Sequence, residues 1–78
     1  MATIKIYSTP TCVYCRMAKE FFDEHKVSYT DHNVAQDAEK RDEMIQRSGQ
    51  MGVPVIDVDG QLIVGFDKAR LMELLNLG

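Results

Sequence analysis

The alternation of apolar and polar positions predicts a strand, a helix and a second strand in the first half of the chain. Residues 3–8 alternate, with Ile4 and Ile6 on one side, which is typical of a half-buried strand. From about residue 12 to residue 26 the apolar positions recur every three or four residues instead, as on the inner face of an amphipathic helix. Residues 27–34 return to a strand pattern.

The middle of the chain carries the signals of a second helix and a third strand. Asp37 is placed to cap the helix at its start, and Gly49 to end it at the C′ position. Residues 52–58 form a β-branched apolar run, which indicates a buried strand. Because proline cannot donate a hydrogen bond to a sheet ladder, Pro54 marks an edge, a first residue or a bend in this run.

A hairpin and a final helix complete the pattern. Asp59-Gly60 separates two apolar runs and is a strong signal for a two-residue turn into residues 61–64. Asp67 then caps a last helix. The order β-α-β-α-β-β-α makes the first two strands parallel with a right-handed crossover, and the last two antiparallel. We therefore expect one α/β domain over residues 1–78, with a four-stranded mixed sheet flanked by three helices.

Composition and charge exclude several classes of function. Hydrophobic residues make up 45% and charged residues 27% of the 78 residues, which is typical of a soluble globular domain. A formal net charge of −3 without a basic run argues against a nucleic-acid partner. The chain shows no signal-peptide pattern and no apolar stretch that could span a bilayer. We expect a cytoplasmic monomer without a membrane partner.

Cys12 and Cys15 are the only cysteines, and they stand where the first strand pattern gives way to the first helix. A dithiol can be a structural disulfide, part of a metal site or a redox pair, and in the cytosol it is seldom structural. The two histidines, His25 and His32, miss the usual zinc-site intervals, so we expect no metal. A helix N-terminus stabilises a thiolate through its free N–H groups, which favours the redox pair.

Four segments, in order, resemble the glutaredoxins, which belong to the thioredoxin-fold superfamily, and the likeness covers nearly the whole chain. They are Thr11-Cys12-Val13-Tyr14-Cys15, similar to the family's TCPYC; residues 40–49, similar to its second helix; Gly52-Val53-Pro54, similar to its TVP loop with a cis-proline; and Gly65-Phe66-Asp67, similar to the turn before its last helix. The resemblance implies a thioredoxin-like fold and a glutathione-dependent thiol–disulfide oxidoreductase. Its substrates would be protein disulfides and glutathione mixed disulfides.

The resemblance also implies a role for each site residue. Cys12 is the nucleophile and Cys15 the resolving thiol, with glutathione as a co-substrate and no bound cofactor. The positions that match the family's glutathione groove are Tyr14, Val53, Pro54, Gly65, Phe66 and Asp67. Thr9 and Gln50 complete the groove, at positions where the family carries a lysine and a basic or polar residue.

Two alternatives stay open. Gly65-Phe66 also resembles the turn of the NrdH-type redoxins, which accept electrons from thioredoxin reductase, and the residues at positions 9 and 50 weaken the anchoring of the glutathione carboxylates. The other alternative is not an enzyme but a carrier that holds a glutathione-ligated [2Fe–2S] cluster between two chains. Cys15 argues against it, because members that do this best often have a single cysteine in the motif.

Overall fold

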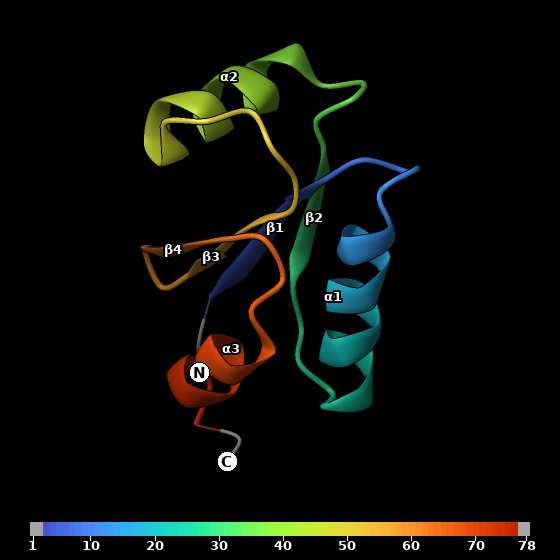
Figure 1. Cartoon of the computed structure of the whole chain (residues 1–78), viewed down its shortest axis with the longest axis vertical. Helices are drawn as coiled ribbons and strands as arrows, with labels where there is room; N and C mark the ends of the chain where they lie inside the picture. Colours follow the sequence, from blue (N-terminus) through green and yellow to red (C-terminus); the bar gives the residue numbers. More distant parts are fainter. Residues whose placement is uncertain (1–2, 77–78) are drawn as a thin grey trace.

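The computed structural model describes residues 3–76, and in this part of the chain the predicted order of elements is confirmed. Figure 1 shows a central sheet with helices on both of its sides. The elements are β1 (Ile4–Ser8), α1 (Val13–Glu24), β2 (Thr30–Asn33), α2 (Ala38–Ser48), β3 (Val55–Val58), β4 (Gln61–Val64) and α3 (Lys68–Leu74).

The four strands form one mixed sheet in the order β2-β1-β3-β4. β1 pairs with β2 in parallel, as predicted for strands that a helix connects, and with β3 in antiparallel. β3 and β4 form the predicted hairpin. Asp59 and Gly60 have φ values of 51° and 91°, and a two-residue hairpin turn with both central φ angles positive is the type that matches strand twist.

Two strands are shorter than their sequence patterns. β2 begins only at Thr30, because Lys26 adopts a left-handed conformation (φ 54°) and the chain turns there before it reaches the sheet. β3 begins at Val55, directly after a cis peptide bond between Val53 and Pro54. Pro54 therefore forms the bend that leads into the strand, and the residues just before it are free of the sheet ladder.

The helix ends follow the predicted caps. The Asp37 carboxylate accepts a hydrogen bond from the Lys40 N–H (3.1 Å), which satisfies one free donor at the start of α2. Gly49 ends the same helix in the left-handed region (φ 75°), where glycine carries no steric penalty.

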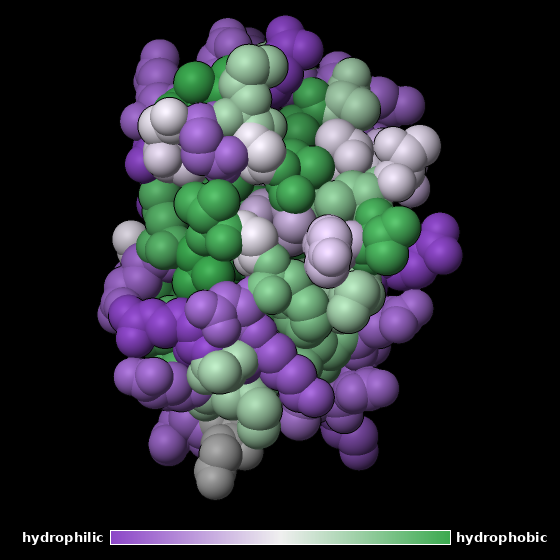
Figure 2. Space-filling model, viewed as in Figure 1, coloured by the Kyte–Doolittle hydropathy of each residue, from purple (hydrophilic) through white to green (hydrophobic). Residues whose placement is uncertain are grey.

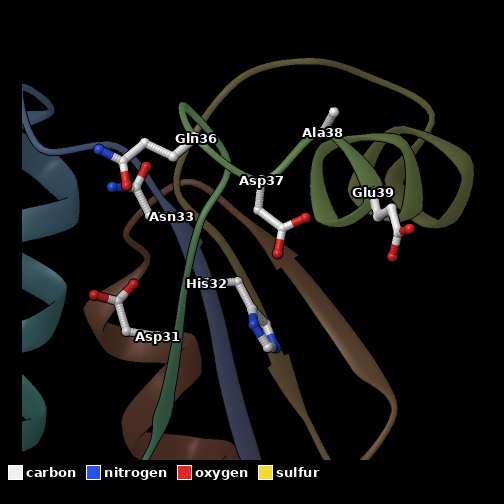
Figure 3. Close-up of a pocket in the computed structure, with 7 residues that line it drawn as sticks. All are labelled: Asp31, His32, Asn33, Gln36, Asp37, Ala38 and Glu39. Carbon is white, nitrogen blue, oxygen red and sulfur yellow. The ribbon is translucent and has the colours of Figure 1, made fainter.

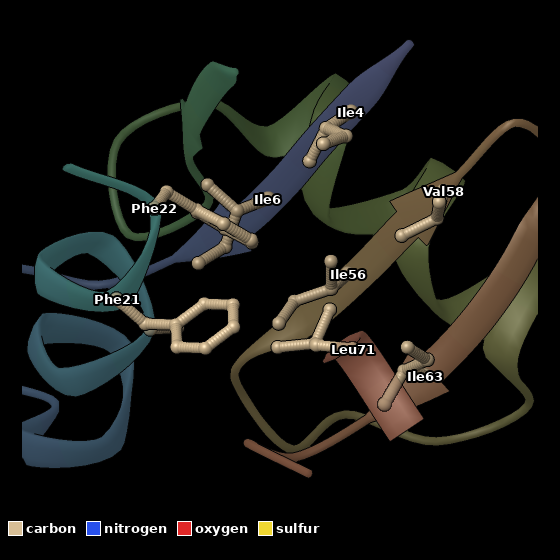
Figure 4. Packing of buried hydrophobic residues seen from close by; sticks show 9 residues of the cluster. Ile4, Ile6, Phe21, Phe22, Ile56, Val58, Ile63 and Leu71 are labelled. Atoms are coloured by element: carbon tan, nitrogen blue, oxygen red, sulfur yellow. The ribbon is translucent and has the colours of Figure 1, made fainter. Parts of the chain in front are cut away.

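The buried residues form two clusters, one on each face of the sheet. The larger cluster lies under α1 and α3, and Figure 4 shows its members: Ile4, Ile6, Phe21, Phe22, Ile56, Val58, Ile63 and Leu71, together with Ala18. The smaller cluster lies under α2 and consists of Tyr7, Val34, Met44 and Val55. The strands alternate between the two faces, as side chains on a pleated sheet must. None of the helices in residues 3–76 has the length and apolar run that a bilayer crossing requires.

Candidate active site

The sheet topology brings three loops to one end of the molecule. The register pairs Tyr7, near the end of β1, with Val55 at the start of β3, and Val55 with Val64 at the end of β4. The loop before α1, the cis-proline loop and the turn before α3 therefore meet. The Gly65 N–H donates to the Pro54 carbonyl at 2.7 Å, which fixes the last two loops to one another.

Cys12 stands at the junction between the first loop and α1, where it is the N-cap residue of the helix. Its Sγ accepts a hydrogen bond from the Cys15 N–H at 3.2 Å. Its thiol also donates across the gap between the loops to the Val53 carbonyl, with an S···O distance of 3.8 Å. The sulfur is only partly buried, so the geometry presents it both to the free donors of a helix N-terminus and to an incoming molecule.

Cys15 lies one turn inside α1 and differs from Cys12 in its exposure. Only 1% of the residue is exposed, and both cysteines are free thiols. Burial, and after it the hydrogen bond with Cys12, raises the pKa of the Cys15 thiol to about 12. In the reduced protein Cys15 is therefore a protonated, enclosed thiol that a partner can reach only by way of Cys12.

Gln50 has a role that the sequence did not indicate. Its side chain folds back on the cis-proline loop, where Oε1 accepts from the Gly52 N–H (2.5 Å) and Nε2 donates to the Gly52 carbonyl (3.0 Å). This double hydrogen bond, which we call the Gln50 clamp, occupies the carboxamide that was expected to face glutathione. A Cβ atom at position 52 would lie 2.6 Å from Oε1, so the clamp in this form requires a glycine two residues after Gln50.

The turn before α3 places its three predicted residues beside the cis-proline loop. Gly65 has a φ of 85°, a conformation that favours glycine. The Phe66 ring packs edge-on against Phe21, with 5.9 Å between centroids, so this partly buried side chain packs against the core. Asp67 caps α3 and accepts from the Arg70 N–H at 3.1 Å.

Thr9 and Tyr14 complete the set of predicted residues. The Thr9 carbonyl accepts a hydrogen bond from the Cys12 N–H at 3.4 Å, so this residue supports the loop through its backbone. Tyr14 projects from the first turn of α1 and is 62% exposed.

Apolar side chains are exposed on the same loops. The large exposed hydrophobic residues of the described chain are Val13, Tyr14, Met17, Met51 and Val64. They come from the start of α1, the cis-proline loop and the end of β4, which are the segments that build the site. Figure 2 shows apolar surface across the middle of the face seen in Figure 1, bordered by hydrophilic residues. Such a surface is suited to contact with a partner.

A separate hollow of about 550 Å³ lies at the end of β2 and the start of α2 (Figure 3), and none of the predicted site residues lines it. Its lining is mainly acidic and amide side chains. Within residues 3–76, no three His, Cys, Asp or Glu side chains are grouped closely enough to hold a metal ion.

Comparisons with known proteins agree with this geometry. The family model named Glutaredoxin matches residues 4–63. A glutaredoxin-like 8.6 kDa protein in the rubredoxin operon of Clostridium pasteurianum is 50% identical over 72 residues, which are 92% of this chain and 96% of that protein. Glutaredoxin 3 of Escherichia coli K12 is 43% identical over 67 residues, 86% of this chain and 81% of that protein.

Two further matches, one in sequence and one in structure, have lower identity. The glutaredoxin-like protein NrdH of Lactococcus lactis subsp. cremoris is 28% identical over 71 residues, 91% of this chain and 97% of that protein. The crystal structure of a thioredoxin-like protein superposes with a TM-score of 0.87 at 29% identity, and covers 92% of this chain and 99% of that one. With the cysteine pair at the start of α1 and a cis-proline opposite it, this chain belongs to the glutaredoxin family of thiol–disulfide oxidoreductases.

Proposed function

We propose that this protein is a glutathione-dependent oxidoreductase that reduces protein disulfides and glutathione mixed disulfides, with Cys12 as nucleophile and Cys15 as resolving thiol. The observation that supports this assignment best is the unequal placement of the two sulfurs. Cys12 is partly exposed at a helix N-terminus, whereas Cys15 is 1% exposed and touches Cys12 through its N–H at 3.2 Å. The first sulfur is therefore the one that can meet a substrate, and the second lies beside it, where it can attack the mixed disulfide.

The proposed reaction has two exchanges. The Cys12 thiolate attacks one sulfur of the substrate disulfide, a bond forms between Cys12 and that sulfur, and the other substrate sulfur leaves as a thiolate that takes up a proton. The Cys15 thiol then loses its proton and attacks Cys12, which releases the bound sulfur and leaves a Cys12–Cys15 disulfide. Two molecules of glutathione return this disulfide to the dithiol and become glutathione disulfide. Glutathione can also replace Cys15 in the second exchange.

The backbone of Val53 offers the docking edge for the incoming molecule. No intramolecular acceptor is found for the Val53 N–H within residues 3–76, and its carbonyl meets only the Cys12 thiol. An extended tripeptide or a substrate strand can therefore pair with this residue as an added strand would. We propose that Tyr14 packs against such a ligand, and that the Phe66 N–H and Asp67 receive the γ-glutamyl end of glutathione.

One observation favours a second candidate, a redoxin that thioredoxin reductase reduces directly. The Gln50 clamp withdraws a carboxamide from the groove, and Thr9 offers no positive charge there. Both features weaken the recognition of the glutathione carboxylates. A protein strand that pairs with Val53 needs neither the Gln50 side chain nor a charge at position 9. The similarity to the NrdH protein of Lactococcus lactis points in the same direction.

The electron donor is tested by comparing two reconstituted systems on one disulfide substrate. One contains glutathione, glutathione reductase and NADPH, and the other contains thioredoxin reductase and NADPH. We expect turnover in the glutathione system, with Cys12→Ser as the inactive control in both. Turnover in the thioredoxin reductase system and none in the glutathione system would contradict the proposal, and would show that thioredoxin reductase is the electron donor.

We further propose that the chain acts as a monomeric single domain in the cytoplasm, where a glutathione pool keeps such a dithiol reduced. The two free thiols and the exposed active-site loops are consistent with this proposal. Sedimentation of the reduced protein measures the oligomeric state, and a mass of two chains would contradict it.

A further inference from the structure

Cys15 is buried, and the two cysteines by themselves do not explain how its thiol can ionise. To resolve a mixed disulfide, the Cys15 thiol must ionise, yet burial raises its pKa to about 12. A buried thiolate needs a nearby positive charge, because a thiol in apolar surroundings is otherwise inert. The Cys15 side chain lies on the inner side of α1, so that charge has to come from the same helix face or from the sheet below it.

Lys19 is placed to supply this charge. It follows Cys15 by four residues on α1, and residues four apart lie on the same face of a helix. Two groups lower the pKa of the Cys15 thiol against the effect of burial: first a hydrogen bond with the Thr9 backbone, and then the positive charge of Lys19, which is the one side-chain charge of the two. Arg16, the cation next in sequence, is exposed and adjacent to Cys15 along the chain, and neighbouring positions point in different directions around a helix.

Two polar residues on the sheet keep the lysine in this position. The Lys19 Nζ lies 2.6 Å from an Asp31 carboxylate oxygen, and only 28% of the lysine side chain is exposed. The other Asp31 oxygen accepts from the Ser8 hydroxyl at 2.6 Å, and Ser8 is 1% exposed at the end of β1. Figure 3 shows Asp31 pointing to the side of β2 on which α1 runs, while His32 points to the opposite side.

We propose that Lys19, held by Asp31 and Ser8, is a positioning residue that promotes ionisation of the Cys15 thiol in the resolving step. The inference rests on the proposed function, in which Cys15 resolves the mixed disulfide. In that step Cys15 gives its proton to water, its sulfur bonds to Cys12, and the bond between Cys12 and the partner sulfur breaks. The partner leaves as a thiolate and takes up a proton. Lys19 keeps its own proton and contributes only its charge.

The other charged and titratable groups around this pair are few. Cys12 acts on Cys15 from the same helix and opposes its ionisation. Asp31 faces Lys19 from β2, and Tyr29 is near both Lys19 and Asp31. Burial raises the pKa of Tyr29, so this phenol carries no charge in a neutral assay. Lys19 is therefore the cation whose removal should be felt at Cys15.

The first test measures Cys15 alone, in the Cys12→Ser background, through its rate of alkylation by iodoacetamide across pH. This reagent is neutral, so surface charge does not steer its approach. We expect Lys19→Gln to slow alkylation about three- to tenfold below the pKa of Cys15, as the loss of one nearby charge predicts. Lys19→Arg should restore most of the rate. Lys40→Gln, which removes a lysine paired with Glu43 on α2, is the matched control and should have no effect.

Two results would overturn the inference. Unchanged alkylation in Lys19→Gln would show that the charge does not reach Cys15, and equal slowing in Lys19→Gln and Lys19→Arg would show a role in packing alone. Release of a thiol from a mixed disulfide on Cys12 provides the second test in the full dithiol protein. If release does not depend on Cys15, the proposed function fails. If it depends on Cys15 and not on Lys19, only this inference fails.

Discussion

Arg47 of α2 and Asp57 of β3 form an ion pair across the layer between helix and sheet, with 2.8 Å between Nη1 and Oδ2. Asp57 is 5% exposed, and its other oxygen accepts from the Gly60 N–H at 2.7 Å. The same Arg47 nitrogen donates to the buried Tyr7 hydroxyl at 3.4 Å. The pair therefore joins α2, β1 and the hairpin turn, on the face of the sheet opposite to Cys15.

Removal of this arginine should destabilise the fold without touching the dithiol. Arg47→Met leaves the buried Asp57 carboxylate with one hydrogen bond, and an unpaired buried charge costs about 2–3 kcal/mol or more. Urea unfolding should show this loss, while Arg41→Met, at an exposed position of the same helix, should cost little. Equal midpoints for the two variants would show that the pair contributes nothing.

Acid should weaken the contact between Glu43 and Tyr7. The hydrogen bond from the Tyr7 hydroxyl (3.0 Å) is the main cause that lowers the pKa of Glu43 below its ordinary value of 4.5. A carboxyl with a lowered folded-state pKa stabilises the protein above 4.5 and loses this contribution as the pH falls through the folded value.

The stability advantage of the wild type over Glu43→Gln should therefore shrink below pH 4.5. Urea unfolding at a series of pH values measures this difference, and Glu20→Gln, at an exposed position of α1, corrects for the general loss of one carboxylate. The side chain of Glu43 is 40% exposed, so the effect should be small. A difference that stays constant with pH would contradict the assignment.

The two cysteines should respond differently to substitution. Cys12→Ser should abolish all turnover, because no other thiol in the described chain is exposed to substrate. Cys15→Ser should leave the reduction of glutathione mixed disulfides in place, since a second glutathione can resolve them, and should impair the reduction of protein disulfides. Parallel assays on both substrates measure this separation, which an equal loss in the two variants would rule out.

The Gln50 clamp predicts that the effect of Gly52→Ala on stability depends on whether Gln50 is present. In the wild-type background, Gly52→Ala brings a Cβ atom to 2.6 Å from Oε1 and displaces the flexible Gln50 side chain, so it should remove about 1 kcal/mol of hydrogen bonding. In the Gln50→Ala background no clamp remains. There, Gly52→Ala should be neutral or stabilise the fold, because alanine restricts the unfolded chain.

A double-mutant cycle with urea unfolding measures this coupling. Additive losses would show that Gly52 is required for another reason.

The sequence by itself determined the features whose causes are local. The alternation around Ile4, the capping residue Asp37 and the Asp59-Gly60 dipeptide each act within a few residues, so each could be identified without a structure. The two cysteines at the start of a helix belong to this class as well, because their spacing and the helix N-terminus lie in one segment. These signals predicted the fold and a redox-active cysteine pair, and the resemblance to the glutaredoxins implied that Cys12 is the nucleophile.

Only the tertiary structure decided how distant polar groups are paired. The contact between Lys19 and Asp31 joins a helix to a strand, and the pair of Arg47 and Asp57 joins a later helix to the sheet. No sequence pattern predicts either contact, because the fold, and not the spacing along the chain, sets the distance between the two residues. The unequal burial of the two sulfurs has the same origin: the sheet encloses one face of α1, and Cys15 lies on that face.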